Sequence, residues 1–190
     1  LLEKEGTAYV DAPVSGSKAG ARNGGLTTWV GGEEAQLGEL NKLLQTIAEN
    51  VFYLDETGLG CAMKLVNQCI HIQNMAAIGE GLTIAKSYGL DEETIVASLQ
   101  TSSANSAMLE RFGSKIANRD SAPMFRMAHA SKDLRQVIND AGTPLEQVPG
   151  CAATASKMSA AIEAGLEGKD FSVIGWPAQD QEFDRGPRLT

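Results

Sequence analysis

The sequence predicts an α/β segment followed by an all-helical domain with a long central helix. In the first part of the chain, short β-rich runs alternate with a helical pattern, and this order is typical of α/β folds. From Gly60 onward every periodic segment is helical, and the longest covers residues 61–88. We therefore expect three regions: residues 1–57, residues 58–175 and a polar tail, residues 176–190.

The α/β segment contains three short β-rich runs that predict strands: residues 8–13, 26–30 and 51–54. A glycine-rich loop, residues 14–25, is expected between the first two strands. Residues 33–49 carry leucine and isoleucine at helical spacing, with glutamates in the first turn, where the helix dipole favours negative charge. Residues 1–6 are expected to be the last turn of a preceding helix.

The helical domain begins with the long helix, which is expected to end at Gly89, a residue type favoured directly after a helix. Asp91 is expected to cap the next helix, because its side chain can accept a hydrogen bond from a free N–H of the first turn. Later helices are expected at residues 106–117, 122–141 and 151–165.

Composition excludes several classes of protein. The chain is 43% hydrophobic, and its net charge of −8 does not favour a nucleic-acid partner. No window approaches the ~18 apolar residues that a membrane span needs, so no membrane partner is expected. Three cysteines without a CxxC pair suggest the cytoplasm or another reducing compartment, and Cys61 and Cys69 are too far apart on one helix to be bridged. No metal-ligand motif occurs, so no metal site is expected.

The long helix carries four polar side chains at the spacing of one helix face: Lys64, Asn67, Gln68 and His71. Its sequence between Lys64 and Glu80 has no Asp, Glu, Lys or Arg, which predicts burial on most sides. Burial lowers the pKa of a lysine toward the range that a general acid or base needs. The alternative is that Lys64 lies near the helix end and extends its ammonium group to water. Spacing alone leaves both readings open.

Residues 15–17, Ser-Gly-Ser, form the second candidate site. Small residues after a strand expose backbone N–H groups, which bind anions such as carboxylates. The alternative is a simple connection between strands.

A third candidate is a face formed by Phe125, His129, Lys132 and Asp133, spaced i, i+4, i+7 and i+8. An aromatic ring, a cation and an acid could line a cleft there. The alternative is a charged face exposed to solvent.

Four motifs, in order, resemble the β-hydroxyacid dehydrogenase family. This family includes 3-hydroxyisobutyrate dehydrogenase, tartronate semialdehyde reductase, and glyoxylate and succinic semialdehyde reductases. The motifs are DAPVSG at residues 11–16, LTTWVGG at 26–32, GCAMKLVN at 60–67 and KDL at 132–134. The resemblance covers residues 9–174. It implies the end of a Rossmann-type nucleotide-binding domain followed by a helical substrate and dimerisation domain, like that of 6-phosphogluconate dehydrogenase.

The resemblance also implies an NAD(P)-dependent oxidoreductase that interconverts a small 3-hydroxyacid, or another hydroxy carboxylate, and its semialdehyde. Lys64 would be the general acid in reduction and the base in the reverse direction, and Asn67 would hydrogen-bond the substrate or hold Lys64. The resemblance further implies that Ser15, Gly16 and Ser17 bind the substrate carboxylate. Phe125 and Asp133 would close the substrate pocket, and Lys132 would lie beside the nicotinamide cofactor.

Two departures from the family pattern carry information. Ser17 stands where the family usually has a second glycine, as in its glyoxylate and succinic semialdehyde reductase branch. The sequence begins with Leu and contains no GxGxxG turn, so we expect it to start about a hundred residues late, within the second half of the nucleotide-binding domain. The cofactor is NAD or NADP, because the residue that separates them follows that turn.

The long helix has apolar residues on more faces than a small helical domain can cover, which predicts a homo-oligomer. The alternative function is that of a non-enzymatic relative, in which the helical domain serves as an oligomerisation or scaffold module.

Overall fold

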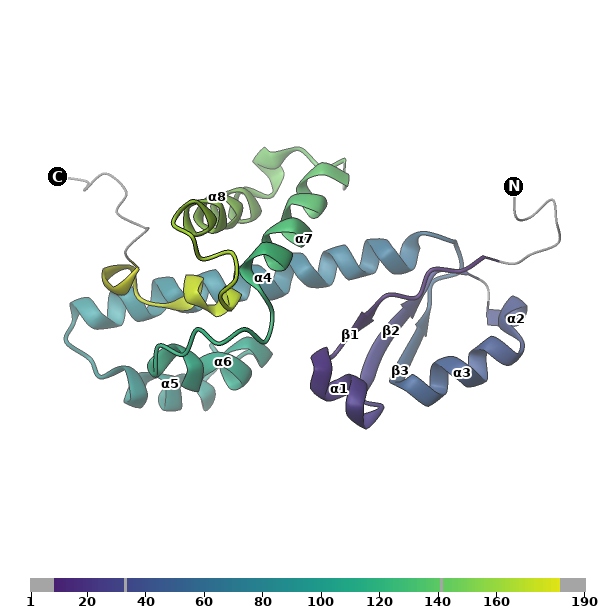
Figure 1. The fold of residues 1–190 in the computed structure, drawn as a ribbon, viewed down its shortest axis with the longest axis horizontal. Helices are drawn as coiled ribbons and strands as arrows, with labels where there is room; N and C mark the ends of the chain where they lie inside the picture. The colour runs from purple at the N-terminus through teal and green to yellow at the C-terminus, as the bar shows by residue number, and fades with distance from the viewer. Residues whose placement is uncertain (1–8, 33, 141, 182–190) are drawn as a thin grey trace. The chain divides into compact units, whose positions relative to one another are not determined.

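The computed structural model describes residues 9–32, 34–140 and 142–181, and the contacts within the chain divide it into two units. The first unit is Leu1–Asn67 and the second is Gln68–Thr190. The division falls inside the long helix α4, Leu59–Ser87, which is therefore shared between them (Figure 1). The predicted order of an α/β segment and an all-helical segment is confirmed.

The first unit contains a three-stranded mixed sheet. Its strands are β1 (Val14–Ser15), β2 (Leu26–Val30) and β3 (Ala48–Tyr53), in the order β1-β2-β3. The pair β1–β2 is antiparallel and the pair β2–β3 is parallel. Two helices, α2 (Glu34–Leu37) and α3 (Glu39–Ile47), make the crossover that a parallel pair requires, and α3 packs beside β3 (Figure 1).

Three details of the first unit differ from the sequence prediction. The strand expected at residues 8–13 is reduced to one bridge, between Asp11 and Gly31, because Pro13 has no N–H to donate to a ladder. The loop expected at residues 14–25 contains β1 and a short helix, α1 (Ser17–Asn23), which buries none of its residues. The helix expected at residues 33–49 breaks at Gly38, whose φ is 46°, and β3 begins already at Ala48. Residues 1–6 lie outside the described part.

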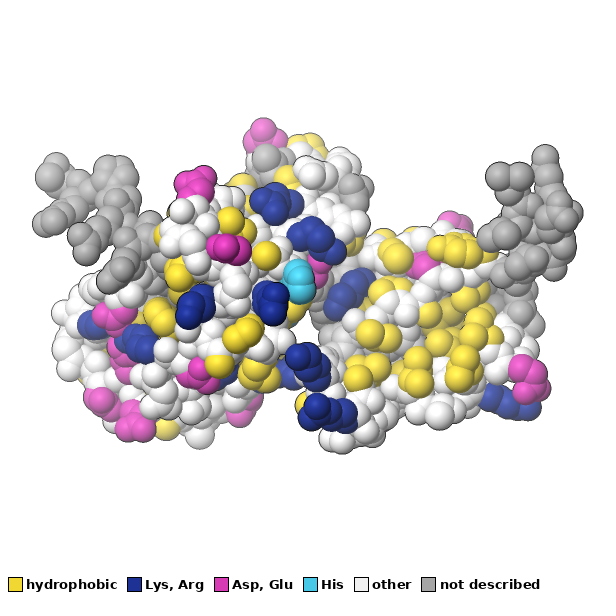
Figure 2. Space-filling model, in the orientation of Figure 1, with side chains coloured by type: hydrophobic (Ala, Val, Ile, Leu, Met, Phe, Trp, Pro, Cys, Tyr) yellow, Lys and Arg dark blue, Asp and Glu magenta, His cyan; other side chains and the backbone are white. Residues whose placement is uncertain are grey.

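Hydrophobic side chains gather over this unit on the face that Figure 2 shows. Phe52, on the edge strand β3, is 53% exposed. Its buried core is small and is formed by Val30, Leu37 and Leu44. An apolar surface of this kind is typical of a face that packs against another element or chain.

The second unit is helical. After α4 come α5 (Glu92–Gln100), α6 (Ala107–Ala117), α7 (Met127–Asp140), the 3₁₀ turn η2 (Leu145–Gln147) and α8 (Pro149–Glu163). In Figure 1, α5 and α6 lie on one side of α4, and α7 and α8 lie on the other. Asp91 caps α5 as predicted, since its carboxylate accepts the N–H of Thr94 at 2.9 Å. The core holds fully buried side chains from α4, α6, α7, α8 and the following 3₁₀ turn: Ile72, Leu82, Ile116, Leu134, Met158 and Phe171.

The helix α7 begins at Met127, later than expected, because an acid from a distant segment holds the preceding residues. Asp170 is completely buried, and its carboxylate accepts the N–H groups of Met124 and Phe125 at 2.6 and 3.0 Å. These two N–H groups are therefore satisfied outside a helix.

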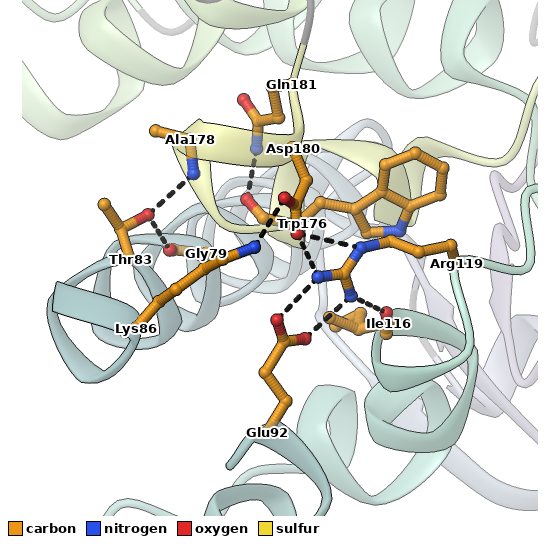
Figure 3. A network of polar contacts seen from close by, with 10 residues as sticks. All are labelled: Gly79, Thr83, Lys86, Glu92, Ile116, Arg119, Trp176, Ala178, Asp180 and Gln181. Carbon is orange, nitrogen blue, oxygen red and sulfur yellow. Dashed lines mark hydrogen bonds and ion pairs between the residues drawn. The ribbon is translucent and has the colours of Figure 1, made fainter. Parts of the chain in front are cut away.

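The polar tail expected from residue 176 packs onto the second unit as far as Gln181. The turns η3 (Phe171–Gly175) and η4 (Ala178–Asp180) are followed by Gln181, which is 2% exposed. Asp180 pairs with Lys86 at 2.5 Å and with Arg119, and Arg119 pairs in turn with Glu92 at 2.6 Å (Figure 3). Charged groups of this tail thus find partners that are distant in the sequence. Residues 182–190 lie outside the described part.

Across the described ranges, even the 29-residue helix α4 falls short of the hydropathy needed to cross a membrane.

Candidate active site

The loop at residues 15–17 has an unusual backbone. Gly16 has a φ of 132° and Ser17 a φ of 61°, so two consecutive residues adopt positive φ. A Cβ on Gly16 would lie 2.9 Å from a methyl group of Leu26, so the position leaves little room for another residue. A residue such as Ser17 in this region costs on the order of 1 kcal/mol, and such residues cluster at functional sites.

The motif that contains this loop is tied to the start of α4 by Asp11. The carboxylate of Asp11 is 8% exposed and accepts the N–H groups of Gly58 and Cys61 at 2.5 and 2.6 Å. Burial alone would raise the pKa of Asp11, but these two backbone donors outweigh it and hold the pKa below its ordinary value. Asp11 therefore fixes the first turn of the helix that carries Lys64.

Two glycines make this attachment possible. A Cβ on Gly31 would collide with the Asp11 carboxylate, and a Cβ on Gly60 would lie 2.8 Å from its other oxygen. Sequence analysis assigned no role to Asp11. The signal that could have found it is an acid directly before Ala-Pro, together with glycines at the end of the next strand and at the start of the helix.

Lys64 and Asn67 lie one turn apart on α4, as the spacing predicted. Both side chains are half-buried. Lys64 is on the second turn of the helix, directly after the turn that Asp11 holds. A half-buried lysine of this kind packs its stem against its neighbours and keeps its ammonium group accessible.

In the second unit, the expected face on α7 is assembled differently from the prediction. Phe125 precedes α7, so it does not share a helix with the other three residues, although its ring centroid lies 6.4 Å from that of His129. Asp133 accepts a hydrogen bond of 2.8 Å from Gln68, a residue of α4 that is 4% exposed. Lys132 is two-thirds exposed and lies 3.0 Å from the Asp133 carboxylate.

An aromatic cluster surrounds Phe125. The ring of His71 stacks on Phe125 at 6.0 Å between centroids, and the edge of Phe171 meets His71 at 5.0 Å and Phe125 at 5.5 Å. His71 thus packs among aromatic rings, and Phe171 is a buried member of this cluster that the sequence did not single out. Nothing in the periodicity around Phe171 identifies it, because it lies in a short 3₁₀ turn.

The predicted site residues divide between the two units. Residues 15–17, Lys64 and Asn67 belong to the first unit, and Phe125, Lys132 and Asp133 belong to the second. Among the described residues, no three His, Cys, Asp or Glu side chains lie close enough together to hold a metal ion.

Two family models match the chain. Residues 58–175 match the model described as "NAD-binding of NADP-dependent 3-hydroxyisobutyrate dehydrogenase". Residues 1–55 match the model described as "NAD binding domain of 6-phosphogluconate dehydrogenase". The two matched ranges follow the order in which the α/β and helical segments occur.

Individual proteins give the same result. The chain is 30% identical over 173 residues to glyoxylate/succinic semialdehyde reductase 2, chloroplastic, of Arabidopsis thaliana, covering 91% of this chain and 48% of that protein. It is 31% identical over 169 residues to 2-hydroxy-3-oxopropionate reductase of Escherichia coli, covering 89% and 58%. A crystal structure of 3-hydroxyisobutyrate dehydrogenase from Salmonella typhimurium superposes with a TM-score of 0.82 at 26% identity, covering 92% of this chain and 61% of that one.

The chain therefore spans about half the length of the curated relatives that it matches. A further relative is named as a nuclear factor and not as a reductase or dehydrogenase. The chain is 29% identical over 170 residues to the cytokine-like nuclear factor N-PAC of Aedes aegypti, covering 90% of this chain and 30% of that protein.

Proposed function

Because the chain belongs to the β-hydroxyacid dehydrogenase family, we propose that it forms the substrate-binding part of an NAD(P)-dependent oxidoreductase. The reaction is the interconversion of a small 3-hydroxyacid, or a related hydroxy carboxylate, and its semialdehyde. One observation carries the proposal: the Asp11 carboxylate joins the substrate-binding motif to the first turn of α4, which carries Lys64. We assign residues 1–57 to the nucleotide-binding domain and residues 58–175 to the substrate domain.

Lys64 moves the proton in this reaction. Its ammonium group donates a proton to the carbonyl oxygen as the carbonyl carbon is reduced, and its neutral amine accepts the hydroxyl proton in the reverse direction. Asn67, one turn along α4, hydrogen-bonds the substrate oxygen or holds the Lys64 side chain. The bound nicotinamide cofactor supplies or accepts the hydride.

Residues 15–17 hold the substrate carboxylate. Ser15 and Ser17 offer hydroxyl groups, and the positive φ values of Gly16 and Ser17 support a loop that turns backbone N–H groups toward an anion. Hydrogen bonds to a charged acceptor are about twice as strong as those to a neutral one, so the loop selects substrates that carry the carboxylate.

We assign Phe125 and Asp133, both in the second unit, to substrate binding. The contact with His71 and Phe171 fixes the Phe125 ring, and the Gln68 amide fixes the Asp133 carboxylate. The exposed ammonium group of Lys132 suits an oxygen of the cofactor, which is NAD or NADP.

The test is an assay of the complete protein with NADH or NADPH as reductant. Succinic semialdehyde and butanal, which both contain four carbons, are compared as substrates. We expect kcat/KM to be higher for the semialdehyde by about 100-fold or more, because butanal leaves the donors of residues 15–17 unpaired. Equal kcat/KM values for the two aldehydes would contradict the proposal.

Self-association is part of the proposed function. Exposed apolar side chains continue along α4 and directly past its end: Ile70 is 57% exposed, Ile84 59%, and Tyr88, which follows the helix, 78%. A second copy of the chain covers this stripe in the proposed oligomer. Light scattering of the protein at micromolar concentration should give a mass above that of the monomer, and the double variant Ile70→Asp/Ile84→Asp should give the monomer mass.

The second candidate function is a non-enzymatic scaffold; the relative named cytokine-like nuclear factor N-PAC has a name that mentions no enzyme. In that case the helical domain serves for oligomerisation only. A turnover assay distinguishes the two functions, because a scaffold oligomerises through α4 but shows no turnover of any semialdehyde with either reduced cofactor.

A further inference from the structure

Two of the three cysteines meet in the second unit although they are distant in the sequence. Cys69 on α4 and Cys151 on α8 place their sulfur atoms 2.8 Å apart. Both are thiols in the structure, as is Cys61, which is exposed. A disulfide bond is about 2.05 Å long, so bond formation needs the sulfur atoms to approach by less than ~1 Å.

The side chain of Gln73 contacts both thiols. The Gln73 amide nitrogen donates to the Cys69 sulfur at 3.0 Å and to the Cys151 sulfur at 3.2 Å. It also donates to the Cys69 carbonyl at 3.1 Å. Gly150 makes room for this amide, since a Cβ at that position would collide with the Gln73 amide oxygen. An N–H donor shared by two sulfur atoms stabilises negative charge on either of them.

The two thiols differ in access. Cys151 is 1% exposed, whereas Cys69 is partly exposed. Burial, together with the neighbouring Cys69, raises the pKa of Cys151 to about 12, so Cys151 is protonated at neutral pH. Cys69 is therefore the sulfur that an oxidant in solution meets first.

We propose that Cys69 and Cys151 are a redox-modification site, at which a peroxide forms a reversible disulfide between α4 and α8. The Cys69 sulfur attacks one peroxide oxygen and the O–O bond breaks, which gives a sulfenic acid and one water. The Cys151 sulfur then attacks the Cys69 sulfur. As the S–S bond forms, the S–O bond breaks, and the departing hydroxide takes the Cys151 proton and leaves as a second water.

In this sequence the two thiols lose two electrons and the peroxide gains them. A dithiol reverses the modification by thiol–disulfide exchange. The site is independent of the proposed dehydrogenase activity. Cys69 directly follows Gln68, whose amide donates to Asp133, a residue of the proposed substrate site.

The experiment treats the native protein with graded hydrogen peroxide, denatures it in an alkylating agent and maps the peptides without reduction. We expect a linked peptide that contains Cys69 and Cys151, with a mass about 2 Da below the sum of the two thiol peptides because two hydrogens are lost. After reduction with dithiothreitol, both cysteines should react with the alkylating agent again. The disulfide should also raise the thermal midpoint by about 5 °C, since it restricts the unfolded chain.

Matched variants identify the pair. Cys61→Ser should form the link as the wild type does, and Cys69→Ser should form none. Cys61 and Cys69 are separated by about 12 Å along α4, so a link between them within one chain is excluded. Recovery of both Cys69 and Cys151 as alkylated thiols, at a peroxide dose that oxidises Cys61, would overturn the proposal. So would a linked peptide that pairs Cys61 with either of them. Because the wild-type protein alone gives these outcomes, the test stands even where a variant fails to fold.

Discussion

The buried amide of Gln68 donates a 2.8 Å hydrogen bond to the carboxylate of Asp133, which joins α4 to α7. Removing this donor should weaken both the packing and the proposed pocket. We expect Gln68→Leu to lower the free energy of unfolding by about 1–3 kcal/mol, because Asp133 loses a partner in a partly buried place. Urea denaturation measures the change. Gln136→Leu, on the exposed face of α7, is the matched control and should change stability by less than about 0.5 kcal/mol.

Asp11 should make folding stability depend on acid pH. Its pKa is lower in the folded state, so it stabilises the fold above its unfolded pKa of about 3.9, and that stability is lost as the pH falls through the folded pKa. We expect Asp11→Asn to be less stable than the wild type at pH 7 and to show a weaker loss of stability between pH 5 and pH 2.

Urea unfolding across that pH range tests this prediction. Asp55→Asn is the control, since Asp55 is an exposed acid of the loop that leads into α4. An Asp11→Asn protein with the wild-type pH dependence would show that the contacts to Gly58 and Cys61 do not stabilise the charged carboxylate.

Arg119 should hold the C-terminal turn to the second unit. Its guanidinium contacts Glu92 and Asp180 and lies 5.9 Å from the centre of the Trp176 ring (Figure 3). We expect Arg119→Ala to lower the free energy of unfolding by about 1–3 kcal/mol, since Glu92 loses its partner and Asp180 keeps only Lys86. Calorimetry measures this loss, and Arg135→Ala on an exposed position of α7 should leave the thermal midpoint near that of the wild type.

Ser15 should act on substrate affinity rather than on the chemical step. We expect Ser15→Ala in the complete protein to raise KM for succinic semialdehyde by about 10-fold, the effect of one lost charge-assisted hydrogen bond. The rate with butanal should stay unchanged, because that aldehyde has no carboxylate to bind. A fall in activity that is the same for both aldehydes would remove the carboxylate-binding role from this loop.

Local signals in the sequence were sufficient for most elements. The run at residues 26–30 lies between glycine pairs, and Asp91 caps the helix that follows it. Both signals depend on neighbouring residues alone, and the structure confirms the strand and the helix. Where the prediction differed, a distant partner or a special backbone decided the outcome. Asp170 delays the start of α7, and Asp180 holds a turn that reads as a polar tail.

The same distinction applies to the site. Helical spacing is sufficient to place Lys64 and Asn67 one turn apart, because it depends only on the helix. The contacts of Asp11 with Cys61, of Gln68 with Asp133 and of Cys69 with Cys151 span 50, 65 and 82 positions. The spacing of residues along a helix or strand does not predict contacts between such distant positions, so only the folded structure shows them.

The most direct test of the account is the turnover of the Lys64→Ala variant of the complete protein. We expect kcat in semialdehyde reduction to fall by about 100-fold or more, the usual range for a lost general acid, and the dissociation constant of the cofactor to stay unchanged. Lys42→Ala, which removes a lysine that is 75% exposed, should keep the wild-type kcat. A Lys64→Ala protein that turns over at the wild-type rate would contradict the assignment of Lys64 as the proton donor.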